Sequence, residues 1–273
     1  MRLGRIPWIN AAPVNAAMDR GIVEPPEVVV SATAAELNDL LAAGELDLSV
    51  VSAVEYARDA ASYHLLPGLA ISCDGPVHSV ALFSNRPVED LDRATVLRTA
   101  SSRTSILLLE LLCRHVWKVQ PNYATARAEA SDLESLSHLP HEAVLVIGDA
   151  ALHLRATDKY PFRYDLGSVW KDWTGLPFVF AVWAARRDTD RAEALALHDR
   201  LLQSRDWGVA NLDLIAAEGA ARTGIDQDTV RDYLDDLDWQ LSYRHLAGLS
   251  EFFGRLASDG LVPDGSLTFL TAA

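Results

Sequence analysis

Four hydroxyl side chains stand together directly ahead of a leucine-rich stretch that predicts a helix. They are Ser101, Ser102, Thr104 and Ser105 in "RTASSRTSILLLELL". One hydroxyl is enough to cap a helix, and the N-terminus of a helix carries unpaired N–H groups and a partial positive charge. The surplus hydroxyls and these N–H groups would suit an organic carboxylate or another small anion. A capped helix with solvated serines is the alternative.

Four further loops carry polar groups where an apolar strand is expected to end. They are "PWINAAP", "VVSAVEYARD", "ISCDGPVHSV" and "LVIGDAAL", and their candidate residues are Asn10, Ser52, Ser72, Asp74, Ser79, Gly148 and Asp149. Asn10 can both donate and accept a hydrogen bond, so it could hold a hydroxyl or a carboxylate. Each loop also has a reading without a ligand: a cap or turn at Asn10 and Asp149, a capping box of Ser52 with Glu55, or a solvated turn.

Several familiar kinds of chemistry lack their sequence signals. The chain has no Ser-His-Asp order, HExxH pair, P-loop or GxGxxG motif, and its two cysteines, Cys73 and Cys113, form no CxxC pair. A disulfide framework and a Cys/His metal site are therefore excluded by cysteine count and spacing. Trp170, Trp173 and Trp183 could line a pocket, although such a cluster more commonly belongs to a core. We expect an oxygen-rich ligand rather than a metal or a phosphate.

Composition and charge narrow the class of partner. The 273 residues carry a net charge of −14, and the 24 Lys and Arg residues are scattered without a basic run. Nucleic acid and anionic membranes are therefore unsuitable partners. The first residues, "MRLGRIPWINAAP", lack the apolar segment of a secretory signal, and no run approaches the ~18 apolar residues of a membrane span. We expect a soluble cytoplasmic protein.

Short apolar runs alternate with helical patterns along the first two thirds of the chain, which predicts α/β architecture with mostly parallel strands. A second α/β unit begins near residue 85, and a long strand over residues 175–186 is followed almost entirely by helices. Polar or Pro/Gly-marked crossings near residues 84–87 and 173–177 predict two lobes. The first comprises residues 1–84 plus 178–273, and the second, inserted lobe comprises residues 85–177. Ligands of such sheets bind beyond the carboxyl ends of the strands, so the five loops would meet in a cleft.

The loops resemble those of the chorismate dehydratase family of the futalosine route to menaquinone. The resemblance runs in order through nearly the whole chain, in "GRIPWINAAPV", "VSAVEYAR", "LLPGLAISCDGPVHSV", "TASSRTSILLLELL", "LVIGDAAL" and "YPFRYDLGSVWKDWTGLPFVFAVWAAR". It implies a fold similar to type II periplasmic binding proteins, with mixed sheets and a ligand cleft between two lobes. It further implies a hydro-lyase that removes water from chorismate to give 3-[(1-carboxyvinyl)oxy]benzoate without a metal or organic cofactor.

The resemblance places Asn10 at a position that matters in catalysis, and the other hydroxyl-bearing loops along the cleft. Losing water from chorismate creates an aromatic ring, so holding the reactive conformer would supply much of the barrier reduction. We expect the Ser101–Ser105 and Ser72–Ser79 segments to bind carboxylates. With no well-placed His or Lys, the base would be the substrate's own enolpyruvyl carboxylate; Asp149 is the alternative acid or base.

Two other functions are compatible with the same loops. One is a cytoplasmic binding protein that captures a small carboxylate without chemistry. The other is the sister enzyme 1,4-dihydroxy-6-naphthoate synthase, which shares the fold and cleaves a larger substrate. The helical C-terminal third would either form a homodimer interface or cover the first lobe.

Overall fold

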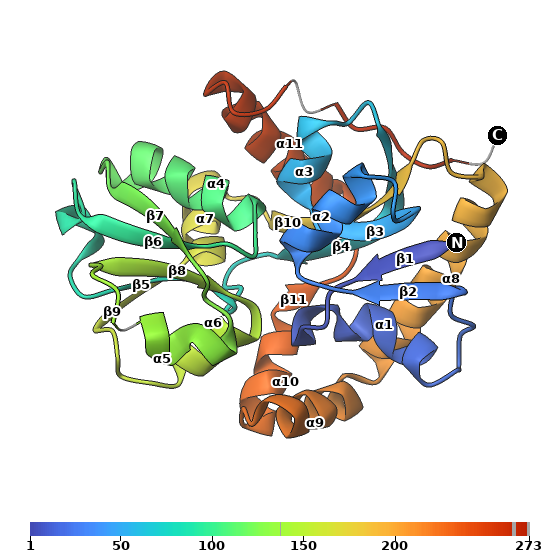
Figure 1. The fold of residues 1–273 in the computed structure, drawn as a ribbon, viewed down its shortest axis with the longest axis horizontal. Helices are drawn as coiled ribbons and strands as arrows, with labels where there is room; N and C mark the ends of the chain where they lie inside the picture. The colour runs from blue at the N-terminus through green and yellow to red at the C-terminus, as the bar shows by residue number, and fades with distance from the viewer. Residues whose placement is uncertain (137, 264–265, 272–273) are drawn as a thin grey trace.

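The computed structural model describes residues 1–136, 138–263 and 266–271, whose strands form two separate sheets (Figure 1). The six-stranded sheet has the order β11-β4-β10-β3-β1-β2. Its strands are β1 (Arg2–Arg5), β2 (Val28–Ser31), β3 (Leu48–Ser52), β4 (Tyr63–Cys73), β10 (Phe178–Arg186) and β11 (Leu237–Asp238). Strands β1, β2 and β3 run parallel, whereas β10 runs antiparallel to β3 and β4. This sheet and its helices are the first lobe.

The five-stranded sheet has the order β7-β6-β8-β5-β9. Its strands are β5 (Val80–Ser84), β6 (Thr95–Thr99), β7 (Asn122–Ala126), β8 (Ala143–Ile147) and β9 (Phe162–Asp165). Strand β6 is parallel to β7 and β8, and β5 is antiparallel to β8 and β9. This sheet and its helices are the second lobe. The predicted α/β fold with two mixed sheets is confirmed.

One strand joins a different sheet from the one that the sequence suggested. Val80–Ser84 is expected in the first lobe, but β5 is an inner strand of the second sheet, where it pairs with β8 and with the edge strand β9. The first crossing between the sheets therefore runs over residues 74–79, and the second over residues 175–177, ahead of β10. Neither neighbour of β5 is close to it in sequence, so no local pattern marks its sheet. The predicted lobe limits otherwise stay a prediction.

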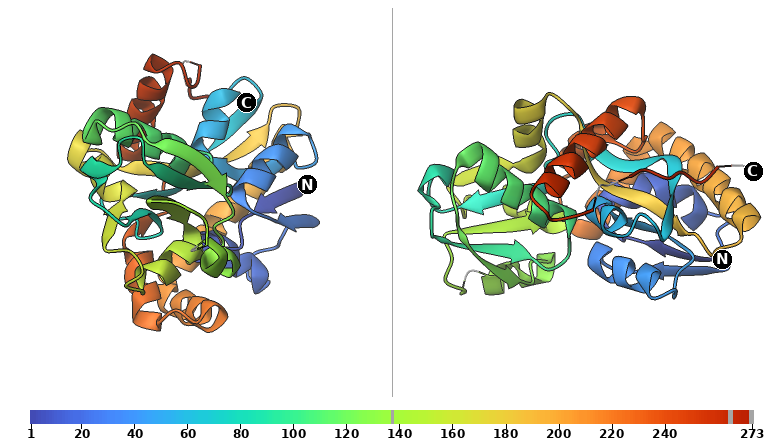
Figure 2. Two further views of the ribbon diagram at one scale, coloured as in Figure 1. Left: turned by 60° about the vertical axis from the view of Figure 1, so that its left-hand side comes forward. Right: turned by 90° about the horizontal axis from the view of Figure 1, so that it is seen from above.

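Helices cover both sheets (Figures 1 and 2). Those of the first lobe are η1 (Ile9–Ala11), α1 (Ala12–Asp19), α2 (Ala34–Ala42), α3 (Ala53–Arg58), α8 (Arg191–Ala210), α9 (Leu212–Thr223), α10 (Gln227–Asp235) and α11 (Tyr243–Ser258). Those of the second are η2 (Val88–Asp90), α4 (Thr104–Leu112), η3 (Cys113–Trp117), η4 (Ala130–Asp132), α5 (Leu133–Leu136), α6 (Gly148–Arg155) and α7 (Leu166–Thr174). In the described ranges no helix is long and apolar enough to cross a membrane.

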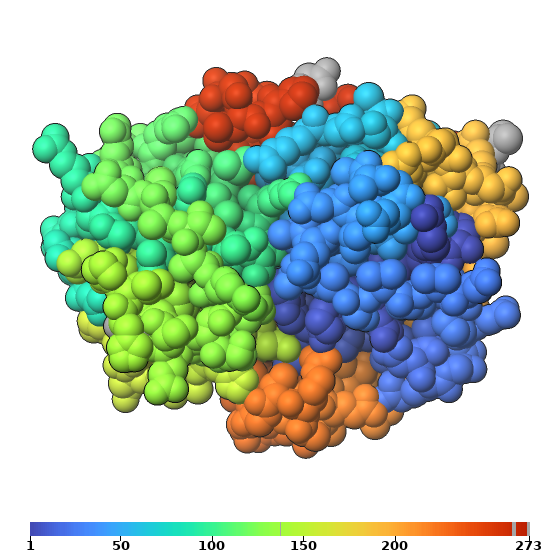
Figure 3. Space-filling model, in the orientation of Figure 1, coloured from blue at the N-terminus to red at the C-terminus, as the bar shows by residue number. Residues whose placement is uncertain are grey.

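The C-terminal helices pack mainly on the first lobe, as one of the two expectations had it. Helix α8 lies against α1, and α11 contacts β10 and α3 of the first lobe and α4 of the second. Seen from above in Figure 2, α11 crosses the junction of the lobes. The two lobes meet along a closed seam on the face drawn in Figure 3. A homodimer stays a prediction.

The central strands are buried on both faces. Every residue of β3 and β8 is buried, as is all of β10 except its last residue. Helices on both faces of a sheet explain why these strands read as continuous apolar runs. The largest apolar cluster includes residues of both lobes, and Trp170 and Trp183 are buried within it rather than lining a pocket.

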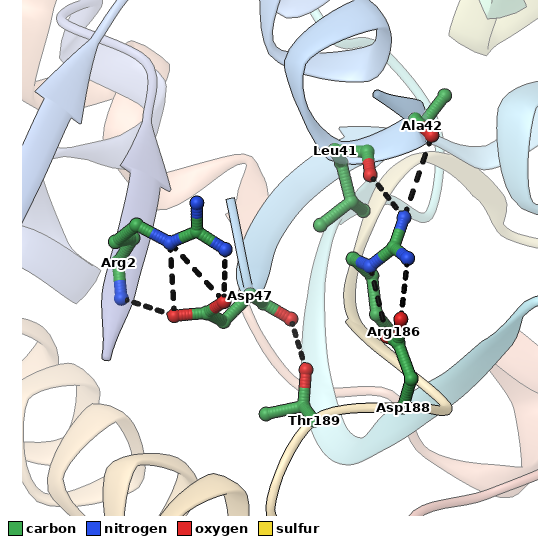
Figure 4. Close-up of polar contacts among 7 residues, drawn as sticks. All are labelled: Arg2, Leu41, Ala42, Asp47, Arg186, Asp188 and Thr189. Atoms are coloured by element: carbon green, nitrogen blue, oxygen red, sulfur yellow. Dashed lines mark hydrogen bonds and ion pairs between the residues drawn. The ribbon is translucent and has the colours of Figure 1, made fainter. Parts of the chain in front are cut away.

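A cluster of polar contacts joins three segments at the edge of the first sheet where β1 and β3 begin and β10 ends (Figure 4). The backbone N–H of Arg2 donates to the Asp47 carboxylate at 2.7 Å, and the Arg2 guanidinium pairs with the same group. Thr189 Oγ1 donates to the carbonyl of Asp47 at 3.2 Å, and Arg186 donates to the carbonyl of Leu41 at 3.1 Å. The start of β1 is thereby joined to the turn before β3 and to the end of β10.

Candidate functional site

A hollow lies between the two lobes, with about 460 Å³ of space free of protein atoms, part of it open to solvent. Its walls come from the first lobe, the first crossing and the second lobe. They consist of Ile6, Trp8, Asn10, Ala34, Ser52, Ile71, Val77, Ser79, Val80, Ser102, Ser105, Ile147, Gly148, Phe180 and Ala181. Among the described residues, none with a charged side chain lines it. We refer to this hollow as the interlobe cavity.

Five helix starts converge on the interlobe cavity. Asn10 lies in η1 just before α1, Ala34 begins α2, Ser52 precedes α3, Ser105 is the second residue of α4, and Gly148 begins α6. Helix starts carry N–H groups without intrahelical partners and a partial positive charge. The cavity can therefore receive an anion without an Arg or Lys side chain.

Asn10 presents an unused acceptor at this site. Its Oδ1 is buried and has no hydrogen-bond partner among the described residues. The backbone carbonyl of Asn10 is held by Trp239, whose Nε1 donates to it at 2.7 Å. A buried acceptor without a partner costs about 1–3 kcal/mol, and a ligand with a hydroxyl or amine donor would remove that cost. Asn10 thus lines the cavity at the predicted place.

The four hydroxyls of the second-lobe segment have three different uses. Ser102 and Ser105 line the cavity, and Ser102 Oγ donates to Ser105 Oγ at 3.1 Å. Thr104 Oγ1 accepts from the backbone N–H of Val54 at 3.2 Å, so it caps α3 across the junction of the lobes. Ser101 Oγ donates to Glu129 within the second lobe. Only two of the four therefore face the ligand space.

Ser52 is buried and lines the cavity. The capping box of Ser52 with Glu55, an alternative reading of the sequence, does not form, because the Ser52 side chain makes no capping hydrogen bond. Glu55 pairs instead with Arg103 of the second lobe, which also pairs with Asp39. Arg103 thus forms ion pairs between the lobes, and it does not line the cavity.

The loop "ISCDGPVHSV" places one of its three candidates at the cavity. Ser79 lines the cavity, and its Oγ accepts from the Tyr233 hydroxyl at 2.8 Å. Ser72 is buried and donates to the carbonyl of Asp238 at 2.9 Å, which joins β4 to β11. Asp74 is exposed and pairs with Lys171 and with Arg244 of α11. Ser72 and Asp74 lie outside the cavity wall.

The loop "LVIGDAAL" likewise places one of its two candidates at the cavity. Gly148 lines the cavity and has a φ of +63°, which L side chains rarely adopt. A Cβ there would lie 3.1 Å from the ring of Trp8. Asp149 does not line the cavity; its Oδ1 accepts from the backbone N–H of Ile9 at 3.0 Å, and Arg222 lies 3.4 Å from its Oδ2. Burial raises the pKa of the Asp149 carboxyl, against the N–H of Ile9 and the Arg222 charge.

Some wall residues had no signal in the sequence. Phe180 sits in an apolar stretch that predicts only a strand, and Trp8 belongs to the loop "PWINAAP" but is not one of its candidate residues. Their place at the cavity depends on how the lobes meet. Trp239, which holds Asn10, lies 229 positions away along the chain. No group of three or more His, Cys, Asp or Glu side chains suited to a metal ion occurs within the described parts of the chain.

The fold is that of solute-binding proteins. An Archaeoglobus fulgidus protein of solved structure is 18% identical, with a TM-score of 0.78 over 96% of this chain and 98% of that one. The alkanesulfonate-binding protein SsuA of Xanthomonas axonopodis pv. citri, solved with MOPS, is 16% identical, with a TM-score of 0.69 over 98% of this chain and 96% of its own. These similarities concern the fold alone, and they confirm the predicted periplasmic-binding-protein-like architecture.

Sequence comparison narrows the assignment. A curated chorismate dehydratase of Thermus thermophilus is 35% identical over 239 residues, which cover 82% of this chain and 84% of that protein. The family model described as menaquinone biosynthesis matches residues 1–258. The chain therefore belongs to the menaquinone biosynthesis family.

Proposed function

We propose that the protein is a chorismate dehydratase, a hydro-lyase that converts chorismate into 3-[(1-carboxyvinyl)oxy]benzoate and water. The observation that carries this proposal is the 35% identity with the Thermus thermophilus chorismate dehydratase across 82% of the chain. The interlobe cavity adds physical support, because its convergent helix starts suit a substrate with two carboxylates.

In this proposal the second-lobe wall holds a carboxylate of the substrate. Ser105 lies in the first turn of α4, and its backbone N–H donates to Ser102 Oγ at 3.3 Å. The two hydroxyls can turn their protons toward a carboxylate, which accepts several hydrogen bonds at once. The N–H of Gly148 itself donates to the carbonyl of Ser79 at 2.7 Å, so at the start of α6 the next N–H groups of the first turn would serve the ligand.

Asn10 orients the leaving hydroxyl. Its unpaired Oδ1 accepts a hydrogen bond from the C4 hydroxyl of chorismate and so selects the conformer in which this group departs. The C3–H bond breaks, its electrons form the C3–C4 double bond of the aromatic ring, and the C4–O bond breaks. The proton from C3 and the departing hydroxide together make up the water that is released.

The base in this scheme is the substrate's enolpyruvyl carboxylate. No described residue of the cavity wall has an imidazole, an amine or a carboxylate side chain. Asp149, the alternative base, directs one carboxylate oxygen to the backbone N–H of Ile9 and the other toward Arg222. A carboxylate of the substrate is already in the cavity and needs only the right conformer to reach the C3 hydrogen.

The proposal includes a cytoplasmic location and a place in the futalosine route. Chorismate is a dianion, which an apolar bilayer strongly disfavours. The enzyme must therefore work on the same side of the membrane as its substrate, which in this proposal is the cytoplasm.

The test is turnover of chorismate by the purified full chain, followed by mass spectrometry. We expect a product lighter by one water, together with a large loss of turnover in Asn10→Ala and a smaller one in Ser105→Ala. Asn85→Ala is the control, because Asn85 is exposed and remote from the cavity. Chorismate recovered unchanged would favour a binding protein or the sister naphthoate synthase. Full turnover in both cavity variants would contradict the assigned roles.

A further inference from the structure

We propose that Asp149 is a positioning residue that holds the Asn10 segment in place only when the two lobes are closed. The inference deepens the proposed function and rests on it. Asp149 does not line the interlobe cavity, so in this inference it acts without contacting the reacting atoms. It acts through the short helix η1, which carries Asn10.

The contact is a helix cap supplied by the other lobe. Ile9 is the first residue of η1, and its backbone N–H has no partner within that helix. The preceding residue, Trp8, provides no side-chain cap. Asp149 Oδ1, from the first turn of α6 in the second lobe, accepts this N–H at 3.0 Å. A carboxylate at a helix start is favourable because it complements the helix dipole.

Asn10 is therefore fastened from two sides. The Trp239 contact to its carbonyl comes from the first lobe, to which η1 itself belongs, and persists in any arrangement of the lobes. The Asp149 contact to the neighbouring N–H crosses the junction, and it breaks when the lobes separate. Trp8 packs beside Gly148 at the same point, so closure also seats its ring. Closure thus completes the site by fixing Asn10.

The burial of Asp149 and its contacts with the first lobe favour a positioning role for this side chain. Its side chain is only 16% exposed, whereas that of Arg222 is 50% exposed. Burial raises the pKa of the Asp149 carboxyl, so keeping it charged here has an energetic cost. A simple structural acid on the surface would carry no such cost. Ile9 and Arg222, both of the first lobe, offset part of this cost while the lobes are in contact, and His153 of α6 itself offsets a further part.

Two variants separate the acceptor from the charge. Asp149→Leu removes the acceptor, and Asp149→Asn keeps an oxygen at Oδ1 without the charge. Displacement of a positioned group by about 1 Å can cost roughly 100-fold in rate. We expect Asp149→Leu to lower kcat by about 10- to 100-fold with KM changed less than about 3-fold, and Asp149→Asn to keep kcat within about 3-fold of wild type.

The matched control is Asp259→Leu. The Asp259 side chain is 15% exposed and also joins the lobes, because it accepts from His115 and Arg114 of η3. It is remote from η1 and outside the cavity wall. Loss of stability without the kcat effect is expected for this variant. An equal fall of kcat in Asp259→Leu would overturn the inference, because the loss of any contact between the lobes would then lower kcat.

A double-mutant cycle tests whether Asp149 acts through Asn10. In an Asn10→Ala background, Asp149→Leu should cost little further activity, because the group that it positions is already gone. Full multiplication of the two losses, or a wild-type kcat in Asp149→Leu alone, would contradict the proposal. So would an Asp149→Asn variant as impaired as Asp149→Leu.

A second measurement does not depend on turnover. Amide hydrogen exchange of the η1 peptide should be faster in Asp149→Leu than in wild type, and unchanged in Asp149→Asn and Asp259→Leu. A wild-type protein that leaves chorismate unchanged would refute the proposed function alone, because this exchange pattern can still appear. Unaltered exchange at η1 in Asp149→Leu would refute the positioning role, whatever the substrate.

Discussion

Gly148→Ala tests whether the start of α6 must be a glycine for the site to form. Gly148 has a φ of +63°, and an alanine Cβ would lie 3.1 Å from Cδ2 and 3.4 Å from Cε2 of Trp8. The left-handed backbone alone costs an L-residue about 1–2 kcal/mol. Relief of the contact requires the Trp8 ring to move by a few tenths of an ångström, and overpacking of this kind adds about 1 kcal/mol. The total expected loss is therefore about 2–3 kcal/mol.

The assay compares this variant with Gly224→Ala. Gly224 has a φ of +75° and nothing within 4 Å of the added Cβ, so it reports backbone strain without the Trp8 contact. For a chain of this size, 1 kcal/mol lowers Tm by roughly 2–4 °C. We expect Gly148→Ala to lower Tm further than Gly224→Ala by about that amount, as measured by thermal unfolding.

Activity gives the second part of the same prediction. Trp8 lines the interlobe cavity, so its displacement should lower chorismate turnover by about 10-fold, whereas Gly224→Ala should leave turnover unchanged. Equal Tm losses in the two variants, together with full turnover in Gly148→Ala, would refute the reasoning. That result would mean that the Trp8 ring can move away from the added Cβ without cost, contrary to the close contact in the structure.

Two further predictions concern charged pairs. Because Arg2 holds the pKa of Asp47 below its usual range, the Asp47 contribution to stability is complete above its unfolded pKa of about 4 and is lost as the pH falls through the lower folded value. Denaturant unfolding of Asp47→Asn should therefore show a loss of about 1 kcal/mol at pH 7 that shrinks as the pH falls below about 4, and the exposed Asp188→Asn should show little change. Arg103→Met removes the ion pair with Glu55 across the lobes, so the open form should become more populated relative to the closed form. Steady-state kinetics should then show a KM that is higher by roughly 2- to 5-fold, with kcat unchanged. An unchanged KM would contradict a role of this ion pair in closure.

The sequence predicted the loops of the site better than the uses of their side chains. The alternation of apolar runs and helical patterns placed Asn10, Ser52, Ser79, Ser105 and Gly148 at strand ends or helix starts, and all of them line the cavity. Strand ends and helix starts are local features, since they depend on residues a few positions away.

The remaining contacts depend on how the lobes meet, which no local pattern reveals. Thr104 caps a helix that begins at Ala53, and Asp149 caps one that begins at Ile9. Each of these side chains has the type that suits the start of its own helix. The structure instead uses them on the opposite lobe, because closure brings unpaired N–H groups there within reach. Their predicted part in binding the substrate directly stays a prediction.

A net charge of −14 and a doubly negative substrate are compatible because of where the charges lie. Surface carboxylates are screened over about 8–10 Å at physiological salt, whereas the helix starts act within the cavity itself. The uncharged wall also has a chemical consequence for the proposed mechanism. An Arg or Lys next to the enolpyruvyl carboxylate would lower the pKa of that group by about 1–3 units and weaken it as a base. Neutral N–H and hydroxyl donors hold the same carboxylate with less loss of basicity, so binding through helix starts preserves the base that the reaction needs.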